Sequence, residues 1–272
     1  MKHLVLSAVL GLAIASSAAA TPRAEAVLSA LGAERMIELM RLEGLEYGAG
    51  LSEDMFPGRG GARWEAMVSD IYDADRMLET FIDGFAKNFS EEFYEPVERF
   101  YASEIGREVV ALELATREAF LEDGVEDSAR DAIPEFEDNR PETFELISEF
   151  IEVNNLIDEN VIGALNANYA FMTGLSDGGG FPTELTQNQI LNDVWAQEAE
   201  IRENSTEWLY AYLLMAYSSL PSEDMEEYLN LSRSDAGQAL TRALFEGFDD
   251  VFVEISRDLG LAASKFMAGQ EL

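Results

Sequence analysis

The sequence predicts an all-α fold, organised as a tandem duplication of a multi-helix unit that resembles a helical bundle. The chain of 272 residues contains only 7 prolines and no run of alternating apolar and polar residues of the kind that forms strands. Its apolar residues instead recur three and four positions apart. Because this spacing places apolar side chains on one face of a helix, we expect nearly the whole chain to be helical.

Three apolar stripes mark the clearest helices. The first predicts a single helix between Trp64 and Phe85, with Trp64, Met67, Val68, Ile71, Leu78, Phe81, Ile82 and Phe85 on one face. The second stripe consists of Ile105, Val109, Leu112 and Phe120. The third consists of Ala236, Leu240, Ala243, Leu244, Phe248, Val251, Phe252, Ile255 and Leu259. We expect all three to face the hydrophobic core and not a ligand.

Two parts of the chain repeat one pattern. The segment GLSEDMFPG at residues 50–58 is echoed by GLSDGGGFP at residues 174–182. Downstream, Trp64 corresponds to Trp195, and from there the two copies stay in register without a gap. Glycine and proline favour turns, so we expect the echoed segment to be a loop between consecutive helices of each unit.

An acidic segment at residues 121–142 separates the two copies and carries the helix breakers Gly124, Pro134 and Pro141. We place the boundary near Asp138. The resulting division is a signal peptide at 1–20, helical repeat unit 1 at 21–138 and helical repeat unit 2 at 139–272. The sequence leaves open whether the two units share one core.

The N-terminus has the three-part layout of a secretory signal. Lys2 precedes an apolar run from Leu4 to about Ala15, and small residues follow at 18–20. The run is shorter than the roughly 20 apolar residues that span a membrane. We therefore expect cleavage after Ala20 and a soluble periplasmic or secreted protein, as in Gram-negative export, without stable membrane insertion after cleavage.

Composition excludes several function classes. The only histidine is His3, within the predicted signal, and the chain has no cysteine. A Ser-His-Asp triad, a cysteine nucleophile, a disulfide and a Cys/His zinc site are therefore not expected. The formal net charge of −35 disfavours nucleic acid as a partner. The acids of DIYDADRMLE at residues 70–79 lack the glycine turn of a calcium loop, so we predict no specific metal site and no cofactor.

The most similar part of the two copies lies at residues 88–110 and 219–241. It resembles the bacterial "domain of unknown function 2059" family, in which a helix ends in Phe-Tyr, followed by Ser-Pro and then Gly-Gln. The matching residues are Phe100, Tyr101, Ser103 and Gly106 in the first copy and Ser234, Gly237 and Gln238 in the second.

Each copy departs from this family pattern. In the first copy, Glu104 replaces the proline and Arg107 replaces the glutamine. In the second copy, Asp235 replaces the proline, and Leu-Ser at 231–232 replaces Phe-Tyr. The resemblance implies an exported all-helical protein present as two divergent copies. It implies no catalytic, cofactor or metal-binding residue.

Local chemistry predicts a structural role for the motif. A serine before a helix accepts a hydrogen bond from a backbone amide of the first turn, so we expect Ser103 and Ser234 to cap the helices that follow. We expect Gly106 and Gly237 to let the preceding helix approach closely. The motif is therefore interpreted as a tight helix-turn-helix corner that occurs twice.

Two functional hypotheses remain. The first is a non-catalytic binding or interaction module whose partner is an unidentified protein, a peptide or a small apolar ligand. The alternative is a carboxylate-dependent hydrolase or lyase that acts on an envelope polymer, since such chemistry needs only two suitably spaced acids. An acidic envelope protein that responds to divalent ions is a third possibility. The absence of histidine and cysteine from the expected mature chain favours the first hypothesis.

Overall fold

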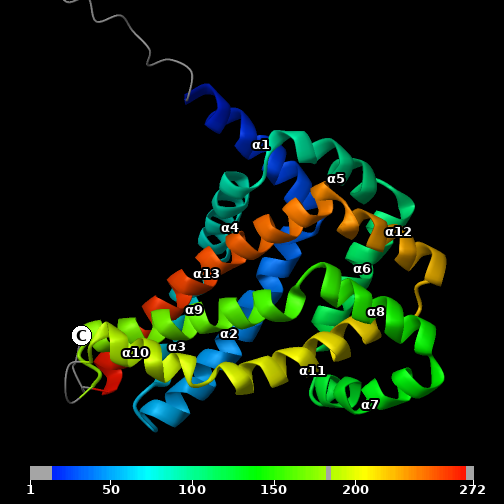
Figure 1. Ribbon diagram of the computed structural model, residues 1–272. Coiled ribbons are helices and arrows are strands. Elements are labelled where there is room, and N and C mark those ends of the chain that lie inside the picture. The colour runs from blue at the N-terminus through cyan, green and yellow to red at the C-terminus, as the bar shows by residue number, and fades with distance from the viewer. Residues whose placement is uncertain (1–13, 182–184, 268–272) are drawn as a thin grey trace, which may run out of the picture.

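The computed structural model describes residues 14–181 and 185–267, and all regular structure within these residues is helical (Figure 1). The predicted all-α class is confirmed. In chain order the helices are α1 (Ile14–Ala30), α2 (Ala33–Met55), α3 (Gly61–Ile71), α4 (Ala74–Asn88), the short 3-10 helix η1 (Glu91–Phe93), α5 (Tyr94–Tyr101), α6 (Glu104–Ala119), α7 (Val125–Asn139), α8 (Pro141–Val153), α9 (Leu156–Asp177), α10 (Gln187–Trp195), α11 (Glu198–Tyr217), α12 (Ser222–Arg233) and α13 (Asp235–Met267).

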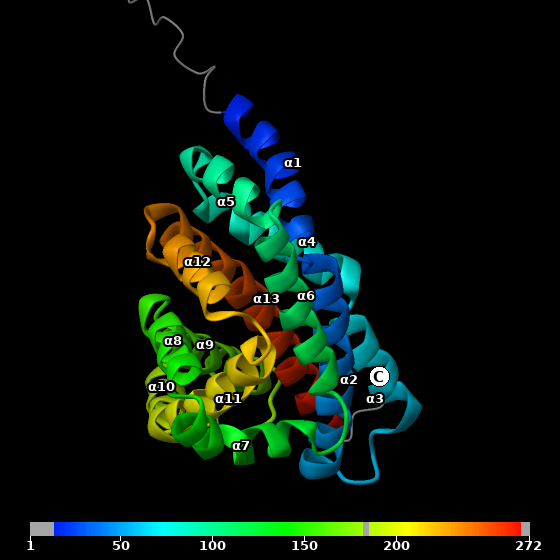
Figure 2. The same ribbon diagram turned by 90° about the vertical axis from the view of Figure 1, so that its right-hand side faces the viewer.

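Helix α13 runs through the middle of the molecule and packs along both α9 and α4 (Figures 1 and 2). It has 33 residues and is the longest helix of the described chain. Its apolar stripe is largely buried, as the sequence predicts, with Leu240, Ala243, Val251, Ile255 and Leu259 each less than 5 % exposed. One helix of the second half is therefore the packing surface for helices of both halves.

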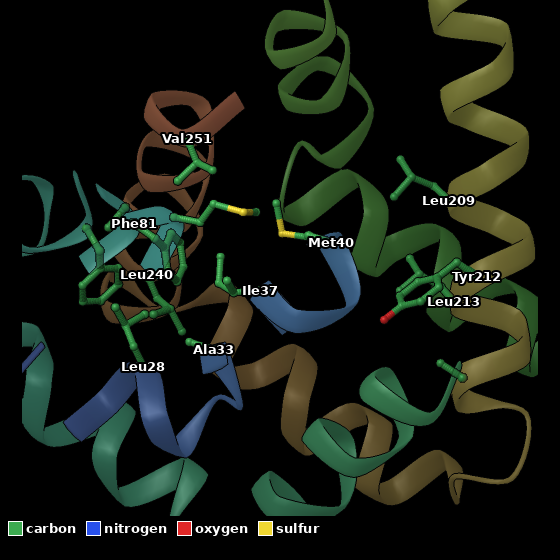
Figure 3. Close-up of a cluster of buried hydrophobic side chains, with 14 of the residues drawn as sticks. Leu28, Ala33, Ile37, Met40, Phe81, Leu209, Tyr212, Leu213, Leu240 and Val251 are labelled. Atoms are coloured by element: carbon green, nitrogen blue, oxygen red, sulfur yellow. The ribbon is translucent and has the colours of Figure 1, made fainter. Parts of the chain in front are cut away.

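The two halves share one hydrophobic core, which answers the question that the sequence leaves open. The largest buried cluster contains Leu28 and Phe81 from the first half together with Leu214 and Leu240 from the second. Figure 3 shows part of this cluster, with Leu28, Phe81, Leu240 and Val251 gathered around the α13 ribbon. The Phe81 ring stacks on that of Phe248 at 4.2 Å between centroids.

Close helix contacts in this core depend on glycine. A Cβ atom at Gly260 of α13 would lie 2.1 Å from the carbonyl oxygen of Phe171 in α9, and one at Gly174 would lie 2.2 Å from the carbonyl oxygen of Arg257. Backbone meets backbone at both places, so a side-chain movement cannot relieve the overlap. The separation between α9 and α13 is thus set by two residues without side chains.

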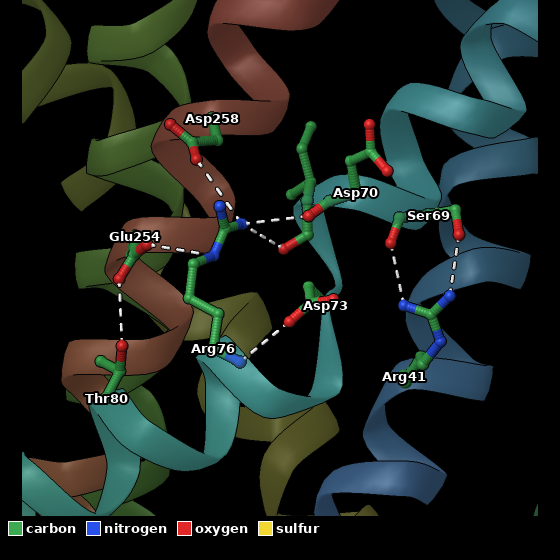
Figure 4. A network of polar contacts seen from close by, with 9 residues as sticks. Arg41, Ser69, Asp70, Asp73, Arg76, Thr80, Glu254 and Asp258 are labelled. Carbon is green, nitrogen blue, oxygen red and sulfur yellow. Dashed lines mark hydrogen bonds and ion pairs between the residues drawn. The ribbon is translucent and has the colours of Figure 1, made fainter.

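The expectation of one continuous helix from Trp64 to Phe85 is wrong, because α3 ends at Ile71 and α4 begins at Ala74. The Asp73 carboxylate accepts a hydrogen bond of 2.9 Å from the backbone amide of Arg76 and so caps α4. The Arg76 guanidinium in turn donates to the carbonyl oxygen of Ile71 at 2.7 Å (Figure 4). The acidic segment at 70–79 is therefore a helix-to-helix corner, and the arginine within it, Arg76, pairs with Glu254 and Asp258 of α13.

The prediction that the echoed segments are loops is only partly right. Gly50, Leu51 and Ser52 lie in the last turns of α2, and residues 174–176 lie in α9. The turn itself begins at Phe56, which is fully buried and packs edge-on against Trp64 at 4.9 Å. The second segment ends at Pro182, which lies outside the described residues.

Two boundaries from the sequence can be placed on the fold. Of the predicted signal peptide, residues 1–13 lie outside the described residues, and the remainder belongs to α1. Asp138, the expected unit boundary, lies one residue before the end of α7. In the ranges that the structure describes, no helix is both long and apolar enough to cross a membrane.

A larger residue at the α9–α13 contact should destabilise the protein. Gly260→Ala forces two backbones apart, and overpacking of this kind costs about 1–3 kcal/mol. Gly163→Ala in α9 is the matched control, because its Cβ would meet no atom closer than 4.0 Å and alanine favours a helix by up to about 1 kcal/mol. Urea unfolding should therefore give a lower midpoint for Gly260→Ala and an unchanged or higher one for the control. Equal midpoints would contradict this account of the contact.

Candidate functional site

The first copy of the family motif forms a capped corner between α5 and α6. The Ser103 hydroxyl accepts a hydrogen bond of 3.0 Å from the amide of Gly106, which is the capping that the sequence predicts. A Cβ at Gly106 would lie 2.1 Å from the carbonyl oxygen of Phe100, so the corner is as tight as expected. Phe100 and Tyr101 are buried within it.

The segment interpreted from the sequence as the second copy has the same local geometry between α12 and α13. The Ser234 hydroxyl accepts a hydrogen bond of 3.1 Å from the amide of Gly237. A Cβ at Gly237 would lie 2.0 Å from the carbonyl oxygen of Leu231. Gln238 donates hydrogen bonds of 2.8 Å to the carbonyl oxygens of Val153 and Ser232, which ties this corner to the end of α8.

A large cavity lies away from most of these motif residues. It is a cleft of about 880 Å³ formed by α2, α6, the start of α7, α9, α11 and α13. A smaller cavity of about 180 Å³ adjoins it, and of the predicted motif positions Tyr101 and Gly237 line that smaller space. Phe100, Ser103, Gly106, Ser234 and Gln238 line neither.

The inner wall of the cleft is apolar and aromatic. Its larger apolar side chains are Met36, Met40, Phe120, Trp208, Tyr212, Leu244, Phe245 and Phe248. Trp208 and Tyr212 stack with ring centroids 4.9 Å apart, and Phe120 packs edge-on against both. Met40 and Tyr212 are labelled in Figure 3, where they come from α2 and α11 and so from the two halves of the chain.

The rim of the cleft leaves large apolar groups in contact with solvent. Tyr47 is 57 % exposed, Ile162 is 51 % exposed and Phe252 is 39 % exposed. Phe252 belongs to the third apolar stripe, so the expectation that the whole stripe is core is wrong at this position. It faces the cleft because α13 turns this side away from the buried contacts with α4 and α9.

Glu113 links the two cavities and the two halves of the chain. It lies on α6 and lines both spaces. Its Oε1 accepts hydrogen bonds from the hydroxyl of Tyr217 and, at 3.2 Å, from that of Tyr228. Its backbone carbonyl oxygen accepts a third, of 2.8 Å, from Tyr212. Burial raises the pKa of the Glu113 carboxyl above its ordinary value, and the two tyrosine hydrogen bonds oppose that rise.

Six further carboxylates line the cleft, and they fall into two groups. Glu43 accepts hydrogen bonds from Nε and Nη2 of Arg117, Glu126 pairs with Arg130 at 2.8 Å, and Asp249 accepts hydrogen bonds from Asn166. Burial raises the pKa of Asp249. Glu46, Glu159 and Glu246 form the second group, and within the described chain their carboxylates have no hydrogen-bond or ion-pair partner.

Arg117 is the one basic residue among the described residues that line the cleft. Its bidentate pairing with Glu43 neutralises its charge. Its guanidinium carbon also lies 5.3 Å from the centroid of the Trp208 ring, in the geometry of a cation–π contact. Across residues 14–181 and 185–267, no cluster of three or more acids is placed to hold a metal ion.

Sequence reasoning missed this cleft because its residues come from six helices and each looks ordinary in its own helix. The stripes that supply Leu244, Phe248 and Phe252 have the spacing of core residues. The sequence offers one signal, which is composition: Trp208 and Tyr212 follow a polar and acidic segment of α11. Residues 196–207 are largely exposed, and burial begins at Leu209.

Fold and site together define an all-helical protein with an aromatic cleft bordered by acids between its two halves. Residues 75–135 match the model of a family described as "Uncharacterized protein conserved in bacteria (DUF2059)". This match supports the family resemblance and contains the first copy of the motif, but not the second. No curated protein and no solved structure matches the chain.

The titration of Glu113 should be visible in the stability of the protein. A folded-state pKa above the ordinary value of 4.5 means that the folded protein holds this proton more tightly than the unfolded chain. The resulting stabilisation is complete below about pH 4.5 and is lost as the pH rises through the folded-state pKa. The side chain introduced by Glu113→Gln cannot titrate. As the pH rises through that window, the free energy of unfolding of this variant should therefore increase relative to that of wild type, by at most about 1.4 kcal/mol per pH unit.

The measurement is urea unfolding of wild type, Glu113→Gln and Glu108→Gln at a series of pH values from 4 to 8. Glu108 is exposed on the same helix, so its substitution removes one charge without removing the buried carboxyl. A difference between Glu113→Gln and wild type that is independent of pH would contradict the assignment.

Proposed function

We propose that the protein is a non-catalytic binding module that takes a ligand with an apolar body into the cleft between its halves. The observation that carries this proposal is a preformed cleft of about 880 Å³ with methionine and aromatic walls. Cavities of about 300–1,000 Å³ with mostly apolar walls and a few polar groups are typical of small-molecule sites. Methionine adapts to varied ligand shapes, which suits Met36 and Met40 to such a wall.

We also propose that the protein is exported and acts in the periplasm. The support comes from the N-terminal sequence, with Lys2, the apolar run and the small residues at 18–20. Cleavage after Ala20 would keep the buried residues of α1, since Ala24, Val27 and Leu28 all follow that point. The resemblance of residues 75–135 to a bacterial family is compatible with this location.

The two halves are proposed to be divergent copies of one unit. Helices α1–α6 and α8–α13 follow each other in corresponding order, with α7 between the sets. Gly32 before α2 and Asn155 before α9 both adopt left-handed backbone angles, with φ of 74° and 53°. The copies differ where they meet solvent: Trp64 is 1 % exposed, whereas Trp195 is 64 % exposed.

A carboxylate-dependent hydrolase or lyase acting on an envelope polymer is the second candidate. The observation in its favour is Glu113, a carboxyl with a raised pKa in a cleft, since general acids have this property. However, its Oε1 is already engaged by Tyr217 and Tyr228, and Glu43 is neutralised by Arg117. A binding module therefore accounts for more of the site.

Filling the cleft with a large side chain should abolish the uptake of an apolar probe. We expect the neutral dye N-phenyl-1-naphthylamine to bind wild type with a rise in its fluorescence, and Ala167→Trp to lose this response because Ala167 lines the cleft. Ala199→Trp is the control, since Ala199 is exposed on α11 and lines neither cavity.

Circular dichroism and thermal melting of both variants would establish that each is folded before the titrations are compared. No dye response in wild type, or an equal response in the two variants, would contradict a binding role for the cleft. Turnover of cell-envelope polysaccharide that is lost in Glu113→Gln would instead favour the enzyme candidate.

A further inference from the structure

We propose that the ligand of this cleft is a small amphiphile that carries an organic cation on an apolar chain. The inference rests on the proposed binding function and adds the chemical class of the ligand. It is drawn from three features of the cleft: the charge of its rim, the aromatic groups beside that charge, and the apolar interior behind them.

The charge of the rim disfavours anionic and favours cationic head groups. Glu46, Glu159 and Glu246 line the cleft from α2, α9 and α13 and, within the described residues, have no ionic or hydrogen-bonded partner. Arg117, the basic residue of the lining, is already paired with Glu43. A carboxylate or sulfonate head would therefore meet unneutralised acids, whereas a cation would meet complementary charge.

Exposed aromatic side chains line the same cleft as these acids. Tyr47 follows Glu46 on α2 and is 57 % exposed, and Phe252 on α13 is 39 % exposed. The faces of aromatic rings attract cations, most effectively when the cation is poorly hydrated, as in quaternary ammonium groups. Within the cleft the protein already makes one such contact, with the Arg117 guanidinium over Trp208 at 5.3 Å. Aromatic groups and unpaired acids in one cleft point to an organic cation more than to an inorganic one.

The interior behind the rim fits an apolar chain. Its walls are formed by Met36, Met40, Phe120, Leu244 and Phe248, and the whole cleft encloses about 880 Å³. A hydrated metal ion or a polyamine without an apolar segment would leave these walls in contact with water. A ligand with both parts satisfies the rim and the interior at once.

The test uses three amphiphiles that share a ten-carbon chain and differ in head group: decyltrimethylammonium, decyl maltoside and decanesulfonate. Each is titrated calorimetrically into residues 21–272 at a concentration below that at which micelles form. We expect the ammonium compound to bind at least about tenfold more tightly than the maltoside, and the sulfonate to bind most weakly. Added salt should narrow these differences, because it screens charges at an exposed rim.

A matched pair of variants separates the rim from the overall acidity of the protein. The cleft variant carries Glu46→Gln, Glu159→Gln and Glu246→Gln together. The control carries Glu92→Gln, Glu108→Gln and Glu227→Gln, which removes three exposed acids that do not line the cleft. We expect only the cleft variant to lose affinity for decyltrimethylammonium, by about tenfold, while both bind decyl maltoside as wild type does.

The outcomes distinguish this inference from the proposed function. Equal affinity for all three head groups, lost in Ala167→Trp, would overturn the cationic ligand and keep an apolar binding site. Equal losses in the cleft and control variants would also overturn it, since general acidity would then explain the preference. Binding of a leucine- and lysine-rich amphipathic peptide but not of decyltrimethylammonium would overturn it in favour of a peptide. Binding of none of these probes would overturn the proposed function as well.

Discussion

The contact between α13 and α9 at Gly174 and Gly260 determines how the rest of the molecule is arranged. A Cβ atom on either glycine would lie only 2.1–2.2 Å from a carbonyl oxygen of the opposite helix. The two helices can therefore adopt only one separation and one register. Along the same helix α13, Gly247 meets Gly84 of α4, where a Cβ would lie 2.8 Å from the opposite Cα. Helices from both halves are therefore fixed against one central element.

That arrangement explains why a cleft exists between the halves. Glycine contacts hold α4 and α9 against α13, and the face of α13 beside these contacts, with Leu244, Phe248 and Phe252, lines the cleft, where Phe248 also stacks on Phe81 of α4. Helices α2, α6 and α11 complete the walls around this face but do not close over it. An open apolar surface of this kind is unfavourable in water, and a rigid frame is what prevents it from collapsing.

Arginine and the excess of acids have different roles in this protein. Several arginines stabilise the fold. Arg76 donates a hydrogen bond to the carbonyl oxygen of Ile71 at the end of α3, and Arg23 pairs with Glu98 at 2.8 Å. Because acids outnumber bases by 53 to 18, many carboxylates are left over for the surface. The unpaired acids at the cleft are part of this excess, and what distinguishes them is that exposed aromatic side chains line the same cleft.

The sequence was most informative where structure is local. Capping by Ser103 and Ser234 follows from a serine three residues before a buried glycine, and both caps form. The break before Asp73 was equally local and could have been predicted, since Asp73 occupies the same capping position ahead of Arg76. The apolar stripe across the break concealed it, because both helices bury their apolar faces in the same core.

The cleft could not be predicted in this way, because helical spacing indicates which side chains share a face but not what covers that face. Leu240 and Phe252 belong to one stripe of α13, yet Leu240 is 4 % exposed and Phe252 is 39 % exposed. The difference arises from the neighbours that α9 and α4 provide along α13, which is a property of the tertiary arrangement. Glu113 shows the same limit: on α6 it is one acid among many, and only three tyrosines from the other half give it a distinct environment. The cleft and the environment of Glu113 therefore both depend on where the two halves meet.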